Sequence, residues 1–321
     1  MAIKFPTISV IIPTWNRAFF IKSAIDSVLM QTYPVWEILV CDDGSTDDTR
    51  EIVLGYEDKR VIFVEGVHSG LPSAVRNRGM LNATGSYIAF LDSDDEWEPL
   101  KLEKQMELVG KSKTRASASN AIRVLGDFTE DGFLLTYNKD LISINDLIME
   151  NNIICSSLIF ETKLIDEIGL FPEDKMLTVG EDYAYWMRLS LFTSISYVNE
   201  GLVRYMDDPQ QSIRKYSPSN LVLQIRIYRS FFRWLFVNKK ILYLKILFKF
   251  IFAYSNYIFK SFIYKPLINS IAFNFKIRGR VFSETLYYLS FFFKYKFFIF
   301  NYAARLSNIA KSLRKKLLCK I

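Results

Sequence analysis

The 321-residue sequence predicts an α/β fold in which a mostly parallel sheet is flanked by helices, followed by a basic helical region. The first observation behind this is that short β-branched runs alternate with amphipathic stretches through residues 8–91, as in strand–helix–strand units. The second is the division of charge. Residues 221–321 hold 20 Lys and Arg but one acidic residue, Glu284, whereas residues 1–220 hold 21 basic and 33 acidic residues. We therefore expect two domains with different partners, 1–220 and 221–321.

Short apolar runs that end at polar residues or proline predict the strands of the sheet. These runs are Ile8–Ile12, Trp36–Cys41, Val61–Val64 and Tyr87–Leu91. Apolar residues at helical spacing and capping residues predict the helices between them. The expected helices are Phe20–Gln31, a segment from Asp47 or Asp48 to Gly55, and Leu71–Asn82.

Residues 115–220 are less regular. There we expect a strand at Cys155–Phe160 and a helix at Glu181–Leu191, entered through Gly180.

Polar clusters follow Ile12, Cys41 and Leu91, the ends of three predicted strands. In open α/β sheets, ligands bind at the carboxyl ends of the strands. The sequence therefore predicts one ligand site, built from these three clusters.

The cluster after the fourth strand, Asp92-Ser93-Asp94-Asp95, places three carboxylates within four residues. Packing like charges together is costly unless a cation compensates them. Hard oxygen ligands at this density suit Mg²⁺ or Mn²⁺ bound together with substrate phosphates. The alternative is an acidic turn before a helix, where Asp is favoured anyway. The strand that runs straight into the cluster favours the metal site.

Other side chains near the strand ends suit a nucleotide. Trp15 offers a flat face on which a base could stack, and Asp43 could accept hydrogen bonds from a base or ribose. The guanidinium groups of Arg76 and Arg78, on the third predicted helix, could bind phosphate. The alternatives are a core tryptophan, a local turn at Asp43, and solvated arginines.

The pair Glu181-Asp182 precedes an aromatic segment and is a candidate general base in an acceptor cleft. The alternative is that these carboxylates only complement a helix N-terminus.

Composition restricts the chemistry further. There is one histidine, His68, which excludes histidine-cluster metal sites, and three widely spaced cysteines give no disulfide framework or zinc pattern. We expect His68 and the cysteines to be structural or surface residues, so catalysis must rest on carboxylates and arginines. The N-terminus lacks the apolar region of a signal peptide, and no uncharged run approaches the roughly 20 residues of a membrane span. We therefore expect neither export nor a spanning helix.

Five motifs, in this order, resemble family 2 glycosyltransferases of the GT-A fold. They are ISVIIPTWNR (8–17), VCDDGSTD (40–47), AVRNRG (74–79), GSYIAFLDSDD (85–95) and GEDYAYWMRL (180–189). The resemblance covers about residues 7–205. It implies a nucleotide-binding sheet, a nucleotide-sugar donor, a divalent metal and inversion at the anomeric carbon.

The resemblance also implies roles for individual residues. Thr14, Trp15 and Asp43 would hold the uracil or ribose, and Arg76 would contact the nucleotide or its diphosphate. Arg17 and Asp92 would also lie on the nucleotide side. Asp92 and Asp94 would form the DxD pair that binds Mn²⁺ or Mg²⁺, with Asp94 the direct ligand and Asp95 flanking. Asp182, beside Glu181, would be the catalytic base.

The sequence departs from the family pattern at three places. Trp15 stands where tyrosine or phenylalanine is usual, which preserves stacking. The stretch after Val203 reads Met206–Asp208 and lacks the histidine often found there. Gln211–Lys215 only approximates the QxxRW signature of processive synthases, so we expect the transfer of one sugar per encounter.

Residues 221–321 interleave aromatic residues with cations, and Arg226, Arg229 and Arg233 recur at helical spacing. Basic amphipathic helices of this kind lie in the interface of anionic membranes. Single-stranded nucleic acid is the less favoured partner, because the apolar load exceeds what a solvated binding surface tolerates. The third possibility is a helical subdomain that packs on the catalytic domain.

Together these patterns predict a metal-dependent inverting hexosyltransferase, cytoplasmic and peripherally associated with the inner face of the cell membrane. It would transfer glucose, or failing that galactose, from a UDP-sugar to a saccharide on polyprenyl diphosphate, in bacterial O-antigen or capsule synthesis. Two alternatives stay open. A nucleotidyltransferase would be expected to carry a Gly-rich phosphate loop with a lysine near the N-terminus, which this sequence lacks. A non-catalytic nucleotide-sugar-binding protein would bind the donor without turnover.

Overall fold

The computed structural model describes residues 6–125, 128–129, 132–207 and 220–238, and the single residues 246 and 249. Residues 1–249 form one compact unit. The predictions made for residues 250–321 lie outside the described residues.

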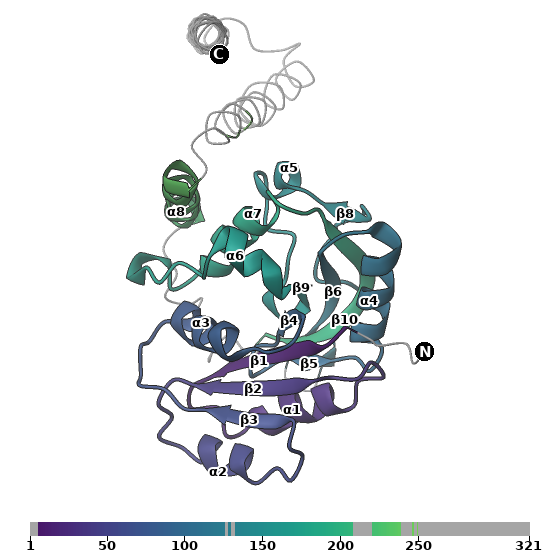
Figure 1. The fold of residues 1–321 in the computed structure, drawn as a ribbon, viewed down its shortest axis with the longest axis vertical. Helices are drawn as coiled ribbons and strands as arrows, with labels where there is room; N and C mark the ends of the chain where they lie inside the picture. Colours follow the sequence, from purple (N-terminus) through teal and green to yellow (C-terminus); the bar gives the residue numbers. More distant parts are fainter. Residues whose placement is uncertain are drawn as a thin grey trace, which may run out of the picture. The chain divides into compact units, whose positions relative to one another are not determined.

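Within the described residues, ten strands form one sheet in the order β3-β2-β1-β4-β9-β6-β10-β5, with β7 on β6 and β8 on β10 (Figure 1). The strands are β1 (Ile8–Thr14), β2 (Glu37–Asp42), β3 (Val61–Val64), β4 (Tyr87–Phe90), β5 (Glu96–Trp97), β6 (Ala116–Leu125), β7 (Phe128–Thr129), β8 (Leu141–Ile142), β9 (Ile159–Glu161) and β10 (Ile195–Met206).

The helices of the described residues connect and cover these strands. They are α1 (Ile21–Leu29), α2 (Thr49–Leu54), α3 (Pro72–Asn82), α4 (Lys101–Ser112), α5 (Ile144–Leu147), α6 (Ile165–Ile168), α7 (Glu181–Leu189) and α8 (Asn220–Asn238), with 3₁₀ turns at η1 (Cys155–Ser157), η2 (Thr162–Leu164) and η3 (Lys175–Leu177). The four strands and three helices predicted within residues 8–91 are confirmed, as is the helix that begins at Glu181.

The sheet is mixed, so the mostly parallel arrangement that was predicted is found in part. Strands β3, β2, β1 and β4 are parallel neighbours, as predicted. Strand β9 then runs antiparallel to both β4 and β6, and β5 runs antiparallel to β10. Strand β10 runs parallel to β6, so parallel pairing recurs in the second half of the sheet. These antiparallel pairs lie where β9 and β5 join it.

Helices cover both faces of the parallel half (Figure 1). Helices α1 and α2 pack on the face that carries Val10, Ile12 and Val40. Helix α3 packs on the other face, and Gly79 allows this close approach. A Cβ atom at Gly79 would lie 2.5 Å from Ile11 Cγ2. Helix α3 therefore lies tightly on β1 and β2, and so fixes the position of Arg76, one turn before Gly79.

Helix α8 packs on α7. The ring of Trp234 lies 5.3 Å from the Arg188 guanidinium carbon, and the Tyr228 hydroxyl donates to the Ile148 carbonyl at 3.0 Å. Phe231 and Leu235 are fully buried. Helix α8, the described part of the basic region, therefore packs on the catalytic domain, as in the third of the possibilities given above. None of the helices in the described ranges is both long and apolar enough to cross a bilayer.

Candidate active site

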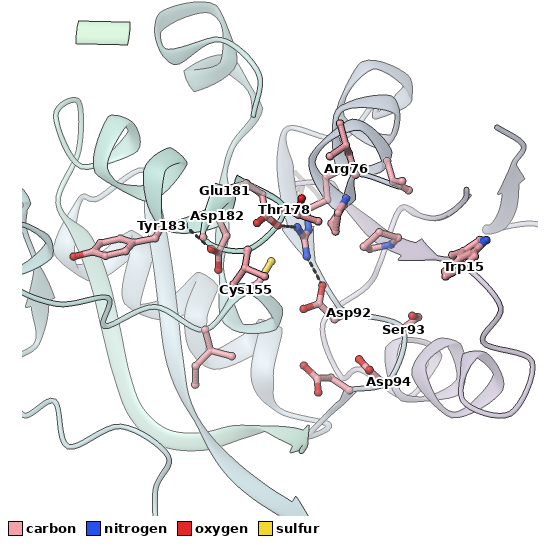
Figure 2. Close-up of a pocket in the computed structure, with 18 of the residues that line it drawn as sticks. Trp15, Arg76, Asp92, Ser93, Asp94, Cys155, Thr178, Glu181, Asp182 and Tyr183 are labelled. Atoms are coloured by element: carbon pink, nitrogen blue, oxygen red, sulfur yellow. Dashed lines mark hydrogen bonds and ion pairs between the residues drawn. The ribbon is translucent and has the colours of Figure 1, made fainter. Parts of the chain in front are cut away.

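A cavity of about 710 Å³ lies at the carboxyl ends of β1, β2 and β4. The structure brings together there the candidate nucleotide, metal and base residues that the sequence analysis named. The cavity is lined by Thr14, Trp15, Arg17, Asp43, Arg76, Asp92, Asp94, Glu181 and Asp182, among others. Trp15 lies at one end of the site and Asp182 at the other, with Arg76 and Asp92 between them (Figure 2).

At the Trp15 end, the ring of His68 stacks on the indole with centroids 4.7 Å apart. The Asp43 carboxylate is buried and accepts from the backbone N–H groups of Ser69 and Gly70, each at 2.9 Å. It also lies 3.1 Å from His68 Nδ1. His68 was expected to be a structural or surface residue, and its side chain is 49% exposed at the cavity wall. No pattern in the sequence singles it out, because its contacts come from a loop far along the chain.

Hydrogen bonds hold together the loop after β1 and the loop after β2, next to the Trp15 end of the cavity. The Asp42 carboxylate accepts from the N–H groups of Gly44 and Ser45 at 2.9 and 2.8 Å, an Asx-type turn. Asn16 has a φ of 52° and accepts from the Thr46 N–H at 2.8 Å. The Thr14 hydroxyl is buried and has no hydrogen-bond partner among the described residues. The cavity therefore offers an unused polar group where the nucleoside is expected.

In the centre, Arg76 joins the two acidic groups of the site. Its Nη2 donates to Asp92 at 2.7 Å and its Nη1 donates to Glu181 at 2.6 Å. The guanidinium is 6% exposed. Burial acts to lower the pKa of Arg76, yet Cys155 and the two carboxylates hold that pKa well above its usual range. Arg76 is thus a fixed positive charge between the predicted metal residues and the predicted base.

The loop that carries the acidic cluster is anchored by Asp95 and Ser156. Ser156 Oγ accepts from the Asp92 N–H at 3.0 Å and donates to the Asp95 carboxylate at 2.5 Å. The Met206 N–H donates to the other Asp95 oxygen at 3.0 Å. Burial, with the charges of Asp94 and Asp92, raises the pKa of Asp95 well above its usual value. Asp95 is therefore an internal anchor of the loop.

Ser156 lies in η1, where a strand at Cys155–Phe160 was expected. That prediction is wrong in its first half, since β9 begins only at Ile159. The reason is local. The Ser157 hydroxyl and N–H both bond the Ile154 carbonyl, at 2.8 and 2.9 Å, and this closes a turn. The turn aims Ser156 at the acidic loop.

Asp94 differs from Asp95 in exposure. Its side chain is 36% exposed, and it forms an ion pair with Arg17, whose Nη2 lies 3.9 Å from Asp94 Oδ2. Asp92 and Asp94 thus present hard oxygen atoms to the cavity. Among the described residues, no three His, Cys, Asp or Glu side chains are grouped closely enough to hold a metal ion.

At the far end, α7 begins with the two acidic residues. Gly180 caps it with a φ of 90°. Glu181 is buried, and burial raises its pKa to about 7, although Arg76 acts in the opposite sense. Asp182 Oδ1 accepts from the Tyr183 N–H at 2.7 Å. The two carboxylates therefore differ. Glu181 is bound to Arg76, and Asp182 lies at the cavity wall (Figure 2).

Solved structures share this architecture. Staphylococcus aureus TarS 1-349 in complex with UDP-GlcNAc matches with a TM-score of 0.63 at 20% identity, over 79% of this chain and 73% of that one. Its complex with UDP matches with a TM-score of 0.58 at 22% identity, over 85% and 75%. The fold is therefore the GT-A type of α/β fold.

Sequence comparison defines the family. The model described as "Glycosyl transferase family 2" matches residues 9–166. The Escherichia coli protein named UDP-Glc:alpha-D-GlcNAc-diphosphoundecaprenol beta-1,3-glucosyltransferase WfgD is 33% identical over 196 residues, 61% of this chain and 74% of that protein. The putative teichuronic acid biosynthesis glycosyltransferase TuaG of Bacillus subtilis is 32% identical over 204 residues, 62% of this chain and 79% of that protein. The chain belongs to the family 2 glycosyltransferases.

Proposed function

We propose that this enzyme is a metal-dependent inverting hexosyltransferase that transfers one sugar per encounter from a UDP-sugar to a lipid-linked saccharide. The acceptor would be carried on polyprenyl diphosphate, in the synthesis of a bacterial surface polysaccharide such as O-antigen or capsule. We propose glucose as the transferred sugar, with galactose as the alternative. The name of the Escherichia coli relative, which combines UDP-Glc with a diphosphoundecaprenol acceptor, supports both the donor and the acceptor class.

The proposal depends on one observation. Trp15, Arg76 and Asp182 lie one after another along a single cavity (Figure 2). An aromatic face at one end suits a base, and the buried Thr14 hydroxyl beside it suits a sugar hydroxyl. A fixed guanidinium in the middle suits a diphosphate. A carboxylate at the far end suits proton transfer.

Asp92 and Asp94 fit a divalent cation that is completed by phosphate oxygens, because Mg²⁺ and Mn²⁺ commonly use one or two carboxylates in this way. When bound, the ion would neutralise charge that develops on the leaving diphosphate. Arg76 would add a second positive charge from the protein, held in place by its two ion pairs.

Asp182 would accept the proton of the attacking acceptor hydroxyl. Attack from the side of the sugar opposite the diphosphate, in one displacement, inverts the anomeric centre. Glu181 would act through Arg76 as a positioning residue, because their hydrogen bond ties the start of α7 to the acidic loop.

A donor and acceptor panel tests this function. Purified full-length enzyme is incubated with UDP-, GDP- and TDP-sugars, Mn²⁺ and a synthetic GlcNAc diphosphate lipid, and products are read by mass spectrometry and by NMR of the new linkage. We expect UDP release and an inverted glycoside with UDP-glucose. Binding of UDP-sugar without turnover on any acceptor would favour a binding protein, and release of pyrophosphate would favour a nucleotidyltransferase.

We also propose that the enzyme acts in the cytoplasm, attached peripherally to the inner face of the membrane. Support comes from the basic residues of 221–321 and from the exposed Arg229 and Arg233 on α8. Lipid-linked acceptors would be reached at that surface.

A further inference from the structure

Helix α8 forms part of the cavity wall beside the proposed base. Leu223 and Ile227 line the cavity, and both pack on Gly180, the residue before Glu181 and Asp182. A Cβ atom built on Gly180 would lie 2.7 Å from Ile227 Cδ1 and 3.3 Å from Leu223 Cδ1. The α8 helix therefore belongs to the acceptor end of the site.

The side of α8 that faces away from the cavity is also apolar near Leu223 and Ile227. Val222 is 39% exposed and Ile225 is 56% exposed. Met176, on the neighbouring turn η3, is also 56% exposed. Exposed aliphatic side chains that gather beside a cavity mark a binding surface for an apolar ligand.

Arg226 stands between these inner and outer apolar groups. At 3.6 residues per turn, its position around the helix falls between Leu223, which faces the cavity, and Val222, which faces outward. Its Nη1 donates a hydrogen bond to the Met176 carbonyl at 3.3 Å. A carbonyl oxygen is a neutral acceptor, so this contact does not itself neutralise the positive charge of Arg226.

Three zones thus follow one another outward from Asp182. They are the inner aliphatic wall, the Arg226 cation and the outer aliphatic surface. A lipid-linked saccharide has three parts in the same order, a sugar, a diphosphate and a hydrocarbon chain. We infer that α8 is the acceptor-recognition element of this enzyme, in which Arg226 binds the lipid diphosphate and Val222, Ile225 and Met176 contact the first isoprene units. This inference rests on the acceptor class of the proposed function.

Kinetics of two full-length variants, without vesicles, test the assignment. Ile225→Ser should raise the KM for a GlcNAc diphosphate with a long alkyl chain roughly fivefold, because it removes most of one apolar contact. The KM for the same acceptor with a methyl group in place of the chain should not change. Arg226→Gln should raise the KM of both diphosphate acceptors roughly tenfold and leave that of methyl GlcNAc unchanged. kcat should change less than twofold.

Matched controls exclude a loss of folding. Leu54→Ser replaces an aliphatic side chain of similar exposure on α2, and Arg50→Gln removes an exposed arginine on the same helix. Both should leave all acceptor constants unchanged. The conservative Ile225→Leu should restore the KM of the long-chain acceptor. The dissociation constant of UDP, measured by calorimetry, should be the same in all variants, which separates the lipid diphosphate from the diphosphate of the nucleotide.

Farnesyl diphosphate is a probe that carries the lipid and the diphosphate without the sugar. It should bind the wild type, and Ile225→Ser and Arg226→Gln should each weaken that binding at least threefold. If these changes hold but no GlcNAc acceptor is glycosylated, the acceptor sugar of the proposed function is wrong and the role of α8 stands. If transfer proceeds and both variants behave like the controls, or alter only vesicle binding, the role of α8 is overturned.

Discussion

Glu181 is the residue whose environment predicts a pH dependence that can be measured. Burial raises its pKa to about 7, from 4.5 in an exposed chain. Between these pH values the folded protein binds more protons than the unfolded protein, so the free energy of unfolding falls as pH rises from about 4.5 to 7. The contribution of Glu181 to this fall in the free energy of unfolding is at most about 3 kcal/mol, at about 1.36 kcal/mol for each unit of pKa shift.

Urea unfolding of the wild type and of Glu181→Gln across pH 4.5–8 measures that share. The glutamine variant keeps a hydrogen-bond acceptor for Arg76 but cannot titrate, so its stability should fall less over this range. Parallel pH profiles for the two proteins would show that Glu181 titrates near its ordinary pKa.

Asp182 is predicted to act in chemistry and not in donor binding. Asp182→Asn keeps the size of the side chain and removes its basicity, so kcat should fall at least a hundredfold, within the range for a general base. The dissociation constant of UDP should stay the same, because Trp15 and Arg76 are untouched. Stopped-flow binding and steady-state transfer assays measure the two effects, and normal transfer by the variant would place the base elsewhere.

Asp94 is predicted to act through the metal ion. Asp94→Asn should reduce Mn²⁺-dependent transfer by about a hundredfold or more, the scale for loss of one charge-stabilising group. Asp166→Asn, at an exposed position on α6, is the control and should leave the rate unchanged. Transfer that survives both Asp94→Asn and the addition of EDTA would rule out the proposed metal site.

At the scale of elements, the joint between α7 and α8 depends on Gly180. Its φ of 90° disfavours a side chain, and a Cβ atom there meets Ile227. Gly180→Ala should therefore lower the free energy of unfolding by more than 1 kcal/mol. Gly110→Ala in α4 is the matched control, because a Cβ atom there meets nothing within 4 Å. It should raise stability by about 0.5–1 kcal/mol. Urea unfolding measures both, and equal effects would mean that neither the backbone conformation of Gly180 nor its contact with Ile227 restricts a side chain there.

The first four strands and the helices between them were predictable because each has a regular pattern of apolar residues in its own short stretch of sequence. Strands β1, β2 and β4 are mostly buried apolar runs, and β3 is a partly exposed apolar run. Helix α1 has regular helical spacing, so periodicity alone finds these elements. Strand β6 was missed because it buries Ser117, Ser119 and Asn120 instead of β-branched residues. The Asn120 amide donates to the Leu135 carbonyl at 2.8 Å, whereas the Ser117 hydroxyl has no hydrogen-bond partner among the described residues.

Strand β10 was missed for a different reason. The sequence Asn199-Glu200-Gly201 interrupts its apolar pattern, and the register against β6 shifts between Val198 and Val203. A bulge of this kind breaks the alternation on which strand prediction depends.

The same division holds for the site. The motif residues lie at strand ends, on α3 or at the start of α7, and were predictable from local sequence. Ser156 and His68 reach the site only through contacts between segments far apart in the sequence.

At the scale of the whole molecule, charge separates the chain into an acidic part and a basic part. Residues 221–321 hold 20 basic residues, and α8 exposes Arg229, Arg233 and Phe236 on its outer side. We therefore predict that the full-length protein sediments with vesicles of phosphatidylglycerol and not with those of phosphatidylcholine. Raising the salt concentration from 0.1 to 0.5 M should release it, because salt screens exposed charges.

The share of α8 in this binding can be separated from that of the remaining basic residues. Each basic residue near an anionic surface contributes about 1 kcal/mol, so reversing two charges with Arg229→Glu and Arg233→Glu should weaken vesicle affinity at least thirtyfold. Arg50→Glu with Lys22→Glu reverses two exposed charges on α2 and α1 and should have little effect, because those helices lie outside the basic region. Equal weakening by the two double variants would mean that net charge alone, and not the outer side of α8, directs the protein to the membrane.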